Sequence, residues 1–436
     1  MGSKIFIILF MLTVASFFAL MLFTTGDKNK AYVQFILLSF PFLALDTHYG
    51  DLFFSDFDVV TLSFLFGFYS PKRVSLKNGK IYLTTFIFLV IIIIIGLYKA
   101  ESLTSSTTSY CIEYICLFVF AKISVDEIVA DPAFFHKIVQ CLKIIFLFSL
   151  AFLMGQFVLG VGFSLAKVQN PNVLSEGTRY TSFFQDPQKY AQYLAAMSFI
   201  FLIKDPITQK VSTINYGLFL SALVAILFTG GRGGLGGWAA GMFLVVLFGK
   251  SSYRYAIIVV GILAYIVVDN FKDDISMFKR TSVDDTYAFR FAIWVDAFKI
   301  FLDHKYFGIG LGNYANYVSV HNPDQFWLVD NEITYYDHPE SGYLKFLTEL
   351  GATGFICIYF MIIFPMAQAF FLFIKNKDST IILLISGVIA WMIGFYTVYS
   401  FSDVRMTIFI ITFLVMLATS YKWSNYNIET NAATIL

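Results

Sequence analysis

The sequence has little charge for its length: only 14% of the 436 residues are Asp, Glu, Lys or Arg, and the formal net charge is +1. Such a balance offers no basic surplus for binding nucleic acid, so we expect no nucleic-acid partner. Proline and cysteine are also scarce, with nine prolines and four cysteines. The cysteines all lie inside apolar stretches, where they are typical small buried hydrophobes, and they predict neither a disulfide nor a metal site. These cysteines are Cys111, Cys116, Cys141 and Cys357.

Apolar side chains are abundant instead. Hydrophobic residues make up 58% of the chain, and the mean hydropathy is +0.73, which is more apolar surface than a soluble core could bury. Many apolar runs reach about twenty residues, the length of a helix that crosses the hydrocarbon core, and they do not alternate as the strands of a membrane β-barrel would. The sequence therefore predicts an all-α polytopic integral membrane protein with about twelve to fourteen transmembrane helices.

The apolar runs divide the chain. They lie near residues 5–24, 31–46, 52–70, 80–98, 109–124, 138–163, 189–203, 212–229, 233–249, 253–271, 342–374, 379–399 and 405–421. The first run fits a span and lacks a small-residue cleavage site, so we do not read it as a cleaved signal peptide. We expect four regions: N-terminal membrane helices over 1–170, helices with arginine-bearing junctions over 171–271, one long loop with amphipathic helices over 272–341, and C-terminal membrane helices over 342–436.

The distribution of Lys and Arg predicts the orientation, because basic loops stay in the cytoplasm. The most basic connection, residues 71–80, falls on the same side as 204–210, 250–254 and 375–377 when the spans are counted from it. The long loop 272–341 then lies outside the cytoplasm, and it contains more acidic than basic residues. The N-terminal end is less constrained, since residues 46–58 fit either a partial or a full crossing.

Three arginines fall on the predicted outer side. Arg179 precedes Asp186 and Pro187, which together predict a helix start with an Asp N-cap and Pro in the first turn. Its alternative role is that of an interfacial arginine that reaches toward lipid head groups.

Arg232 lies among glycines between two apolar runs, in the sequence Gly230-Gly231-Arg232-Gly233-Gly234. Glycines expose the amide groups of a helix N-terminus to an anion, although they also allow tight packing between membrane helices. Packing alone does not require an arginine in the middle. The pattern of a nucleotide-binding P-loop is absent.

Arg290 belongs to a predicted amphipathic helix. At 100° per residue it shares a face with Trp294 and Ala297, whereas Asp296 and Lys299 lie on the other face. An arginine on the apolar face is atypical of a solvated position, so we expect it to have a function.

His338 and Glu340 stand where the chain returns to apolar sequence. A lone histidine is usually structural, but at a membrane entry on the side of three arginines His338 is a candidate general base or substrate-orienting group. Upstream, Gly308, Gly310 and Gly312 have the wrong spacing for a dinucleotide fingerprint and predict a turn.

The ordered set of these motifs resembles the bacterial O-antigen ligase and Wzy-type polysaccharide polymerase superfamily. The resemblance covers residues 175–355, and the first 170 residues match in hydropathy only. Ligases of this family often carry Asn after the histidine, whereas Pro339-Glu340-Ser341 stands here and looks like the polymerase branch. The motifs are Arg179 followed by Phe183-Phe184-Gln185-Asp186-Pro187, Gly231-Arg232-Gly233, Arg290 with Trp294, the turn from Gly308 to Tyr314, and His338 with Leu344 and Gly351.

The resemblance implies a glycosyltransferase of the bacterial inner membrane whose active site faces the periplasm. It implies transfer of a glycan from undecaprenyl diphosphate to a sugar hydroxyl of a lipid-linked repeat unit, with no metal and no cofactor, and with a chain-length regulator and a flippase as partners. Arg179, Arg232 and Arg290 would bind the diphosphate, while His338, Arg290 and Glu340 would be catalytic. Arginine suits that task because its planar fork binds phosphate through two hydrogen bonds and stabilises the charge that the leaving group gains.

Two other functions stay open at the level of sequence. A ligase would pass the glycan to the lipid A core or another acceptor. A transporter of lipid-linked glycan usually shows internal repeats and charges at mid-membrane, and neither feature is present here.

Overall fold

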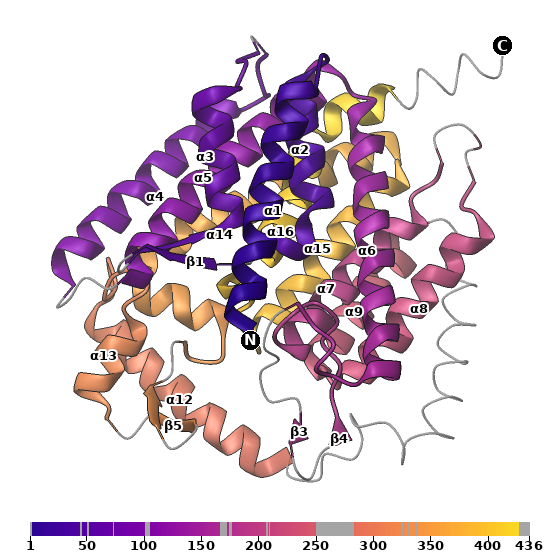
Figure 1. The fold of residues 1–436 in the computed structure, drawn as a ribbon. Helices are drawn as coiled ribbons and strands as arrows, with labels where there is room; N and C mark the ends of the chain where they lie inside the picture. The colour runs from indigo at the N-terminus through magenta and orange to yellow at the C-terminus, as the bar shows by residue number, and fades with distance from the viewer. Residues whose placement is uncertain are drawn as a thin grey trace.

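A computed structural model describes residues 2–43, 46–49, 52–72, 74–100, 105–165, 172–173, 177–205, 208, 210–249, 283–323, 326–329, 332–335 and 338–426. The described chain is a bundle of helices with polar connections at its ends (Figure 1). The predicted apolar segment 253–271 lies outside these residues. The helices are α1 (Gly2–Phe23), α2 (Lys28–Leu38), α3 (Asp56–Gly67), α4 (Gly79–Lys99), α5 (Ser105–Ala130), α6 (Phe134–Leu159), α7 (Pro187–Met197), α8 (Thr213–Thr229), α9 (Arg232–Phe248), α12 (Val283–Asp303), α13 (Tyr314–His321), α14 (Gly342–Asn376), α15 (Ser379–Phe395) and α16 (Val404–Ala418).

The helices confirm the prediction of an all-α polytopic membrane protein. Among the described residues, α4, α6 and α14 are long and apolar enough to cross a membrane, and a fourth span results if α16 and the bent segment Ser420–Tyr426 are counted as one. Four shorter apolar helices accompany them, in α1, α8, α9 and α15. The estimate of about twelve to fourteen spans counted such short helices as full crossings. Helices α2 and α3, with 11 and 12 residues, are each shorter than a span.

Short polar signals set where several helices begin. Asp27 caps α2, Asp186 caps α7 and Asp403 caps α16, each through a carboxylate that accepts backbone N–H groups. Pro187 follows in the first turn of α7, as predicted from the sequence. Three two-stranded hairpins, which we did not predict, lie between helices: β1 (Asp46–Tyr49) with β2 (Leu52–Ser55), β3 (Asn172–Val173) with β4 (Gly177–Thr178), and β5 (Phe326–Val329) with β6 (Glu332–Tyr335).

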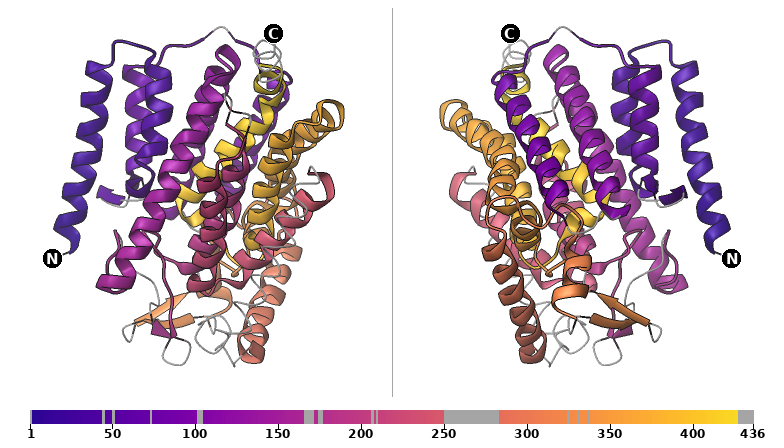
Figure 2. Two further views of the ribbon diagram at one scale, coloured as in Figure 1. Left: turned by 90° about the vertical axis from the view of Figure 1, so that its right-hand side faces the viewer. Right: turned by 90° about the vertical axis from the view of Figure 1, so that its left-hand side faces the viewer.

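Helices α7, α9 and α15 form the most closely packed group. Gly237 of α9 lies against the backbone of Ala390 on α15, where a Cβ atom would come within 2.1 Å of the carbonyl oxygen. A Cβ atom on Gly234 would come within 2.6 Å of the Cβ atom of Ala191 on α7. The glycines of α9 therefore do allow tight packing, the alternative role considered above, and their lack of side chains lets α7 and α15 approach α9 closely. Figure 2 shows α1 at the outer edge of the bundle, away from this group.

Helix α14 is broken at Gly351, whose φ of 65° and ψ of −175° are not helical. The turn after α12 bonds to the backbone at this break. The N–H groups of Ile309 and Gly310 donate to the carbonyls of residues 348 and 349 at 2.9 and 3.0 Å. In return, the N–H of Ala352 donates to the carbonyl of Lys305 at 2.7 Å. Gly308, Gly310 and Gly312 all have positive φ, so they form the predicted turn. This joint fixes the end of α12 against α14.

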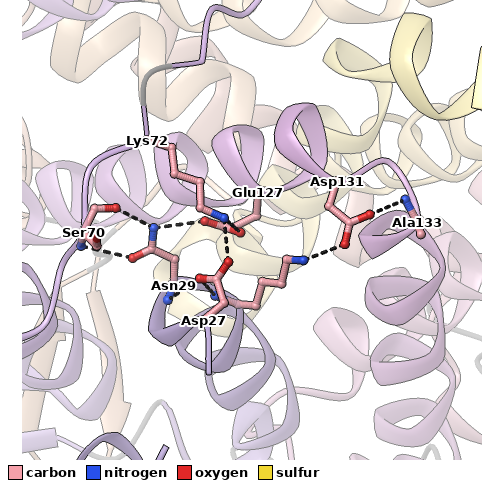
Figure 3. Close-up of polar contacts among 8 residues, drawn as sticks. Asp27, Asn29, Ser70, Lys72, Glu127, Asp131 and Ala133 are labelled. Atoms are coloured by element: carbon pink, nitrogen blue, oxygen red, sulfur yellow. Dashed lines mark hydrogen bonds and ion pairs between the residues drawn. The ribbon is translucent and has the colours of Figure 1, made fainter. Parts of the chain in front are cut away.

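The other end of the bundle carries a polar cluster, which we call the clamp (Figure 3). Lys72 forms ion pairs with Asp27 and with the fully buried Glu127. Asn29 donates to Glu127 and to the carbonyl of Ser70 at 3.0 and 2.8 Å. Another ion pair, Lys30 with Asp131, joins α2 to the α5–α6 connection. The clamp thus ties α2, the connection after α3 and the end of α5 together.

Candidate active site

The site is built around a tight turn at residues 338–341, directly before α14. Glu340 adopts the left-handed conformation, with a φ of 51°, which is rare for a residue with a side chain. Its N–H donates to Nδ1 of His338 at 3.1 Å. Its Oε2 accepts from Nη2 of Arg290 at 3.2 Å. The three candidate catalytic residues are therefore joined here, and Arg290 is also a candidate phosphate ligand.

The hydrogen bond inside this turn determines how His338 is protonated when neutral. Because Nδ1 accepts from a backbone N–H, the neutral ring carries its proton on Nε2. In this conformation, Nε2 is a donor, suited to orient an oxygen of the substrate. A role as general base requires the bond to Glu340 to open or the ring to turn.

Arg290 comes from the side of α12 that faces the protein. Ile293, Ala297 and Ile300 on that side are buried, whereas Lys299 is exposed. The guanidinium is partly accessible, with 19% of the side chain exposed, and Glu340 is similar at 21%. The pair is therefore open to a ligand and is not sealed in a core. The helical face predicted for Arg290 agrees with this arrangement.

Arg179 lies at the C-terminal end of α8. Its Nε donates to the carbonyl of Thr229 at 2.9 Å, and the side chain is buried, with 6% exposed. The N–H of Tyr180 donates to the carbonyl of Phe228 at 3.3 Å. The segment after β4 thus lies across the end of α8. These contacts place Arg179 inside the protein, which does not fit the alternative of a snorkelling interfacial arginine.

Arg232 is the first residue of α9, only one turn after Thr229. Gly230 ends α8 in the left-handed conformation, and Gly231 precedes the first turn of α9. The N-terminal amide groups of a helix and an arginine in its first turn together favour an anion. Arg179 and Arg232 therefore both lie at the junction between α8 and α9.

The connection from α15 to α16, residues 396–403, touches each part of the site. Tyr396 packs on Trp294 of α12 with ring centroids 5.1 Å apart, and Tyr399 lies 5.7 Å from the ring of His338. A Cβ atom on Gly233 would come within 2.4 Å of Oγ1 of Thr397. The α8–α9 junction, the helix of Arg290 and the turn of His338 are thus gathered on one connection.

Sequence reasoning missed charged residues that build this connection. Arg405 is buried and forms a two-pronged ion pair with Asp403, at 2.8 Å from Nε to Oδ1 and 2.6 Å from Nη2 to Oδ2. Its Nη1 also donates to the carbonyl of Phe183 at 2.9 Å, and Lys189 donates to Ser402 at 2.7 Å. Burial alone would raise the pKa of Asp403, but the charge and hydrogen bonds of Arg405 outweigh it and lower that pKa.

A second buried ion pair, which the sequence analysis also missed, lies in the first turns of α14, directly after the turn at residues 338–341. Lys345 donates to Oε1 of Glu349 at 2.9 Å, with 3% and 0% of the side chains exposed. The same carboxylate oxygen accepts the N–H of Tyr314 at 3.2 Å, and Lys345 lies 4.9 Å from the ring centroid of Tyr399. The signal was present in the sequence as Lys and Glu four residues apart inside an apolar run, since such charges are rarely left without partners in a membrane.

One family model matches the part of the chain that contains most of the candidate site residues. Residues 217–359 match the sequence model of the O-antigen ligase family. The range begins after Arg179 and includes Arg232, Arg290, His338 and Glu340. No curated protein matches the chain. The matched range runs from α8 through the first part of α14, and its enzymes transfer glycans from lipid-linked donors. Residues 217–359 of this membrane protein therefore form a domain of the O-antigen ligase family.

Proposed function

We propose that this protein is a surface-polysaccharide polymerase. It transfers a growing glycan from undecaprenyl diphosphate to a sugar hydroxyl of an incoming lipid-linked repeat unit, at the periplasmic face of the bacterial inner membrane and without a metal. The observation that carries the proposal is the joining of Arg290, Glu340 and His338 in one accessible turn, beside the connection that also contacts the α8–α9 junction.

In this proposal the diphosphate binds at the arginines. The bond from the anomeric carbon to the diphosphate oxygen breaks, and that oxygen gains negative charge. Arg232 at the helix N-terminus and Arg290 supply positive charge there, and interactions that strengthen as the charge develops accelerate the transfer. Arg179, whose Nε donates to the carbonyl of Thr229, lies beside the same junction and would add positive potential there.

The acceptor hydroxyl attacks the anomeric carbon, and its proton must leave as the new bond forms. Glu340 is the acceptor group present in this conformation, since His338 presents Nε2–H when neutral. We assign His338 to orient the acceptor or an oxygen of the donor, and Glu340 to take the proton once the diphosphate draws Arg290 away from it. Undecaprenyl diphosphate then departs with the electron pair of the broken bond.

A ligase is the second candidate, and the description of the matching family favours it. The sequence His338-Pro339-Glu340-Ser341 favours the polymerase. Deleting the gene separates the two. Loss of a polymerase leaves single repeat units on the cell surface, whereas loss of a ligase removes the surface polymer and leaves lipid-linked chains.

Purified protein tests the chemistry itself. Incubation with a lipid-linked repeat unit and a chelator should give polymer, with undecaprenyl diphosphate as the second product. Transfer only to a lipid A core acceptor would reject the polymerase, and activity that the chelator abolishes would reject the metal-free reaction.

A further inference from the structure

A cavity of about 740 Å³ lies between α4, α5, α14 and α16, outside the candidate active site. Most of its wall is apolar and comes from side chains such as Leu89, Phe118, Ile362 and Leu414. Its volume is in the range of about 300–1,000 Å³ that is usual for ligand sites. Such a wall suits a hydrocarbon chain.

The cavity lies in the half of the bundle away from the candidate active site. It is lined by α4 from Gly79 to Leu89, whereas Gly96, further along α4, faces the carbonyl of Phe307 in the turn after α12. Val74, Ser75, Leu76 and Asn78, before α4, also line the cavity. Tyr114 and Phe401 also line it, and Phe401 stacks on Trp391 with ring centroids 5.1 Å apart. Phe401 belongs to the connection 396–403, so one residue of that connection forms part of the cavity wall.

Basic groups line the outer part of the cavity. Lys122 is half exposed and pairs with Asp126, whose side chain is 4% exposed. Lys80 is exposed and forms no ion pair with the part of the chain that the structure describes. At the same end, Lys30 and Lys72 are neutralised by carboxylates of the clamp (Figure 3). Lys80 thus leaves the rim of the cavity with a net positive charge.

We propose that this cavity binds an anionic glycerophospholipid of the bilayer, with one acyl chain inside and the phosphate at Lys80 and Lys122. Only an amphipathic ligand satisfies both an apolar wall and a basic rim, and basic pockets between membrane helices are typical sites for anionic head groups. The chain of a donor lipid held at the arginines does not fit as well. Its phosphate would lie near the far end of α4, about 30 Å from Lys80, and would leave the basic rim without a partner. The site does not depend on the proposed function.

Lipid binding to the purified full chain tests the proposal. Native mass spectrometry should show that phosphatidylglycerol, which is anionic, binds more tightly than phosphatidylcholine, which is zwitterionic with equal chains. Lys80→Gln should weaken phosphatidylglycerol binding about fivefold, the usual effect of one basic residue near anionic lipid, and Lys80→Arg should restore it. Lys137→Gln is the matched control, because Lys137 is an exposed lysine at the start of α6 and does not line the cavity.

A second variant tests the apolar wall. Ala121→Trp places a large ring inside the cavity and should lower binding of both phospholipids, while thermal unfolding reports whether the variant still folds. Lys80→Gln keeps the proposal testable if Ala121→Trp does not fold. Equal binding of the two phospholipids, an equal effect of Lys80→Gln and Lys137→Gln, or binding of glycerol phosphate as tight as that of the lipid would overturn the proposal. Preferential binding of undecaprenyl phosphate that is unchanged in Lys80→Gln would assign the cavity to the donor chain instead.

Discussion

The two ends of the bundle use their charges differently. In the clamp, each lysine meets a carboxylate: Lys30 meets Asp131, and Lys72 meets Asp27 and Glu127. At the candidate active site, Arg179 donates to a backbone carbonyl, and Arg290 shares one carboxylate at 3.2 Å with both side chains partly exposed. The clamp pairs of Lys30 with Asp131 and of Lys72 with Asp27 are shorter, at 2.5 and 2.6 Å, than the 3.2 Å pair of Arg290 and Glu340. The longer pair is the one that we propose to open for an incoming anion.

The largest expected loss of stability comes from Arg405, a buried arginine near the candidate active site that forms an ion pair, as the lysines of the clamp do. Arg405→Ala leaves Asp403 buried without its partner, and breaking a buried ion pair in this way costs about 3–5 kcal/mol. Thermal or denaturant unfolding in detergent measures the loss. Lys30→Ala is the control at the clamp, where a partly exposed pair contributes about 0–1 kcal/mol. Equal losses in the two variants would contradict the distinction between buried and exposed pairs.

The Arg405–Asp403 pair also predicts a pH dependence. The pKa of Asp403 is lowered from its ordinary value of 3.8 in the folded protein, so the unfolded chain binds its proton first as the pH falls. The stabilisation is complete above that ordinary value and is lost as the pH drops through the lower folded pKa. Unfolding measured from neutral to acidic pH should therefore show a loss of stability in acid that Asp403→Asn reduces.

The next effect concerns the arginines that we assign to the diphosphate. Arg232→Lys and Arg290→Lys keep the charge but lose the planar fork, so polymer formation should fall about a hundred- to a thousandfold. The unfolding temperature should change little, because Arg232 and Arg290 are both partly exposed. The clamp variant Lys72→Arg should keep full activity. Near-normal polymer from both arginine variants would remove the diphosphate from this site.

His338→Ala should lower transfer about a hundredfold, the low end for a positioned acid–base or orienting group, while binding of undecaprenyl diphosphate stays nearly unchanged. Equilibrium binding and single-turnover transfer on the same preparation separate the two quantities. His338→Gln tests the tautomer, because its amide can still donate a hydrogen bond and should retain more activity than Ala if the ring acts as a donor. Loss of donor binding in His338→Ala would place the histidine with the arginines.

The smallest expected effect is a loss of stability when a residue of the clamp is changed. Asn29→Ala removes hydrogen bonds to Glu127 and Ser70, so unfolding should become easier by about 1–3 kcal/mol, the cost of leaving a buried polar group without its partner. Transfer by the folded fraction should not change. A specific loss of activity without loss of stability would show that the clamp takes part in function.

The sequence predicted those features that depend on residues close together in the chain. The caps at Asp186 and Pro187, the turn at Gly308 to Gly312 and the inward face of Arg290 follow from neighbours in the chain. The break in α14 could not be predicted, because Gly351 adopts its conformation only when residues 305–310 supply the missing hydrogen bonds.

The contacts within the site show the same limit. Nothing local predicts that Glu340 would take a left-handed conformation and join His338 to Arg290, fifty positions earlier in the chain. Arg405 stands at the start of the predicted apolar run 405–421, and its bond to the carbonyl of Phe183 depends on how distant segments pack. The sequence thus indicated which residues to compare, and the packing determined which of them meet.

The joint between the turn at Gly308 and the break at Gly351 has a consequence for how this protein can diversify. Both ends of the segment between α13 and the turn at Glu340 are fixed, one by Tyr314 on Glu349 and the other by Arg290 on Glu340. Because doubling the length of a loop between fixed ends costs only about 0.6 kcal/mol, the hairpin β5–β6 can be lengthened, shortened or exchanged at little expense in stability. Exchanging this hairpin should therefore leave α12, α13 and α14 folded, and thermal unfolding of the exchanged variant would measure it.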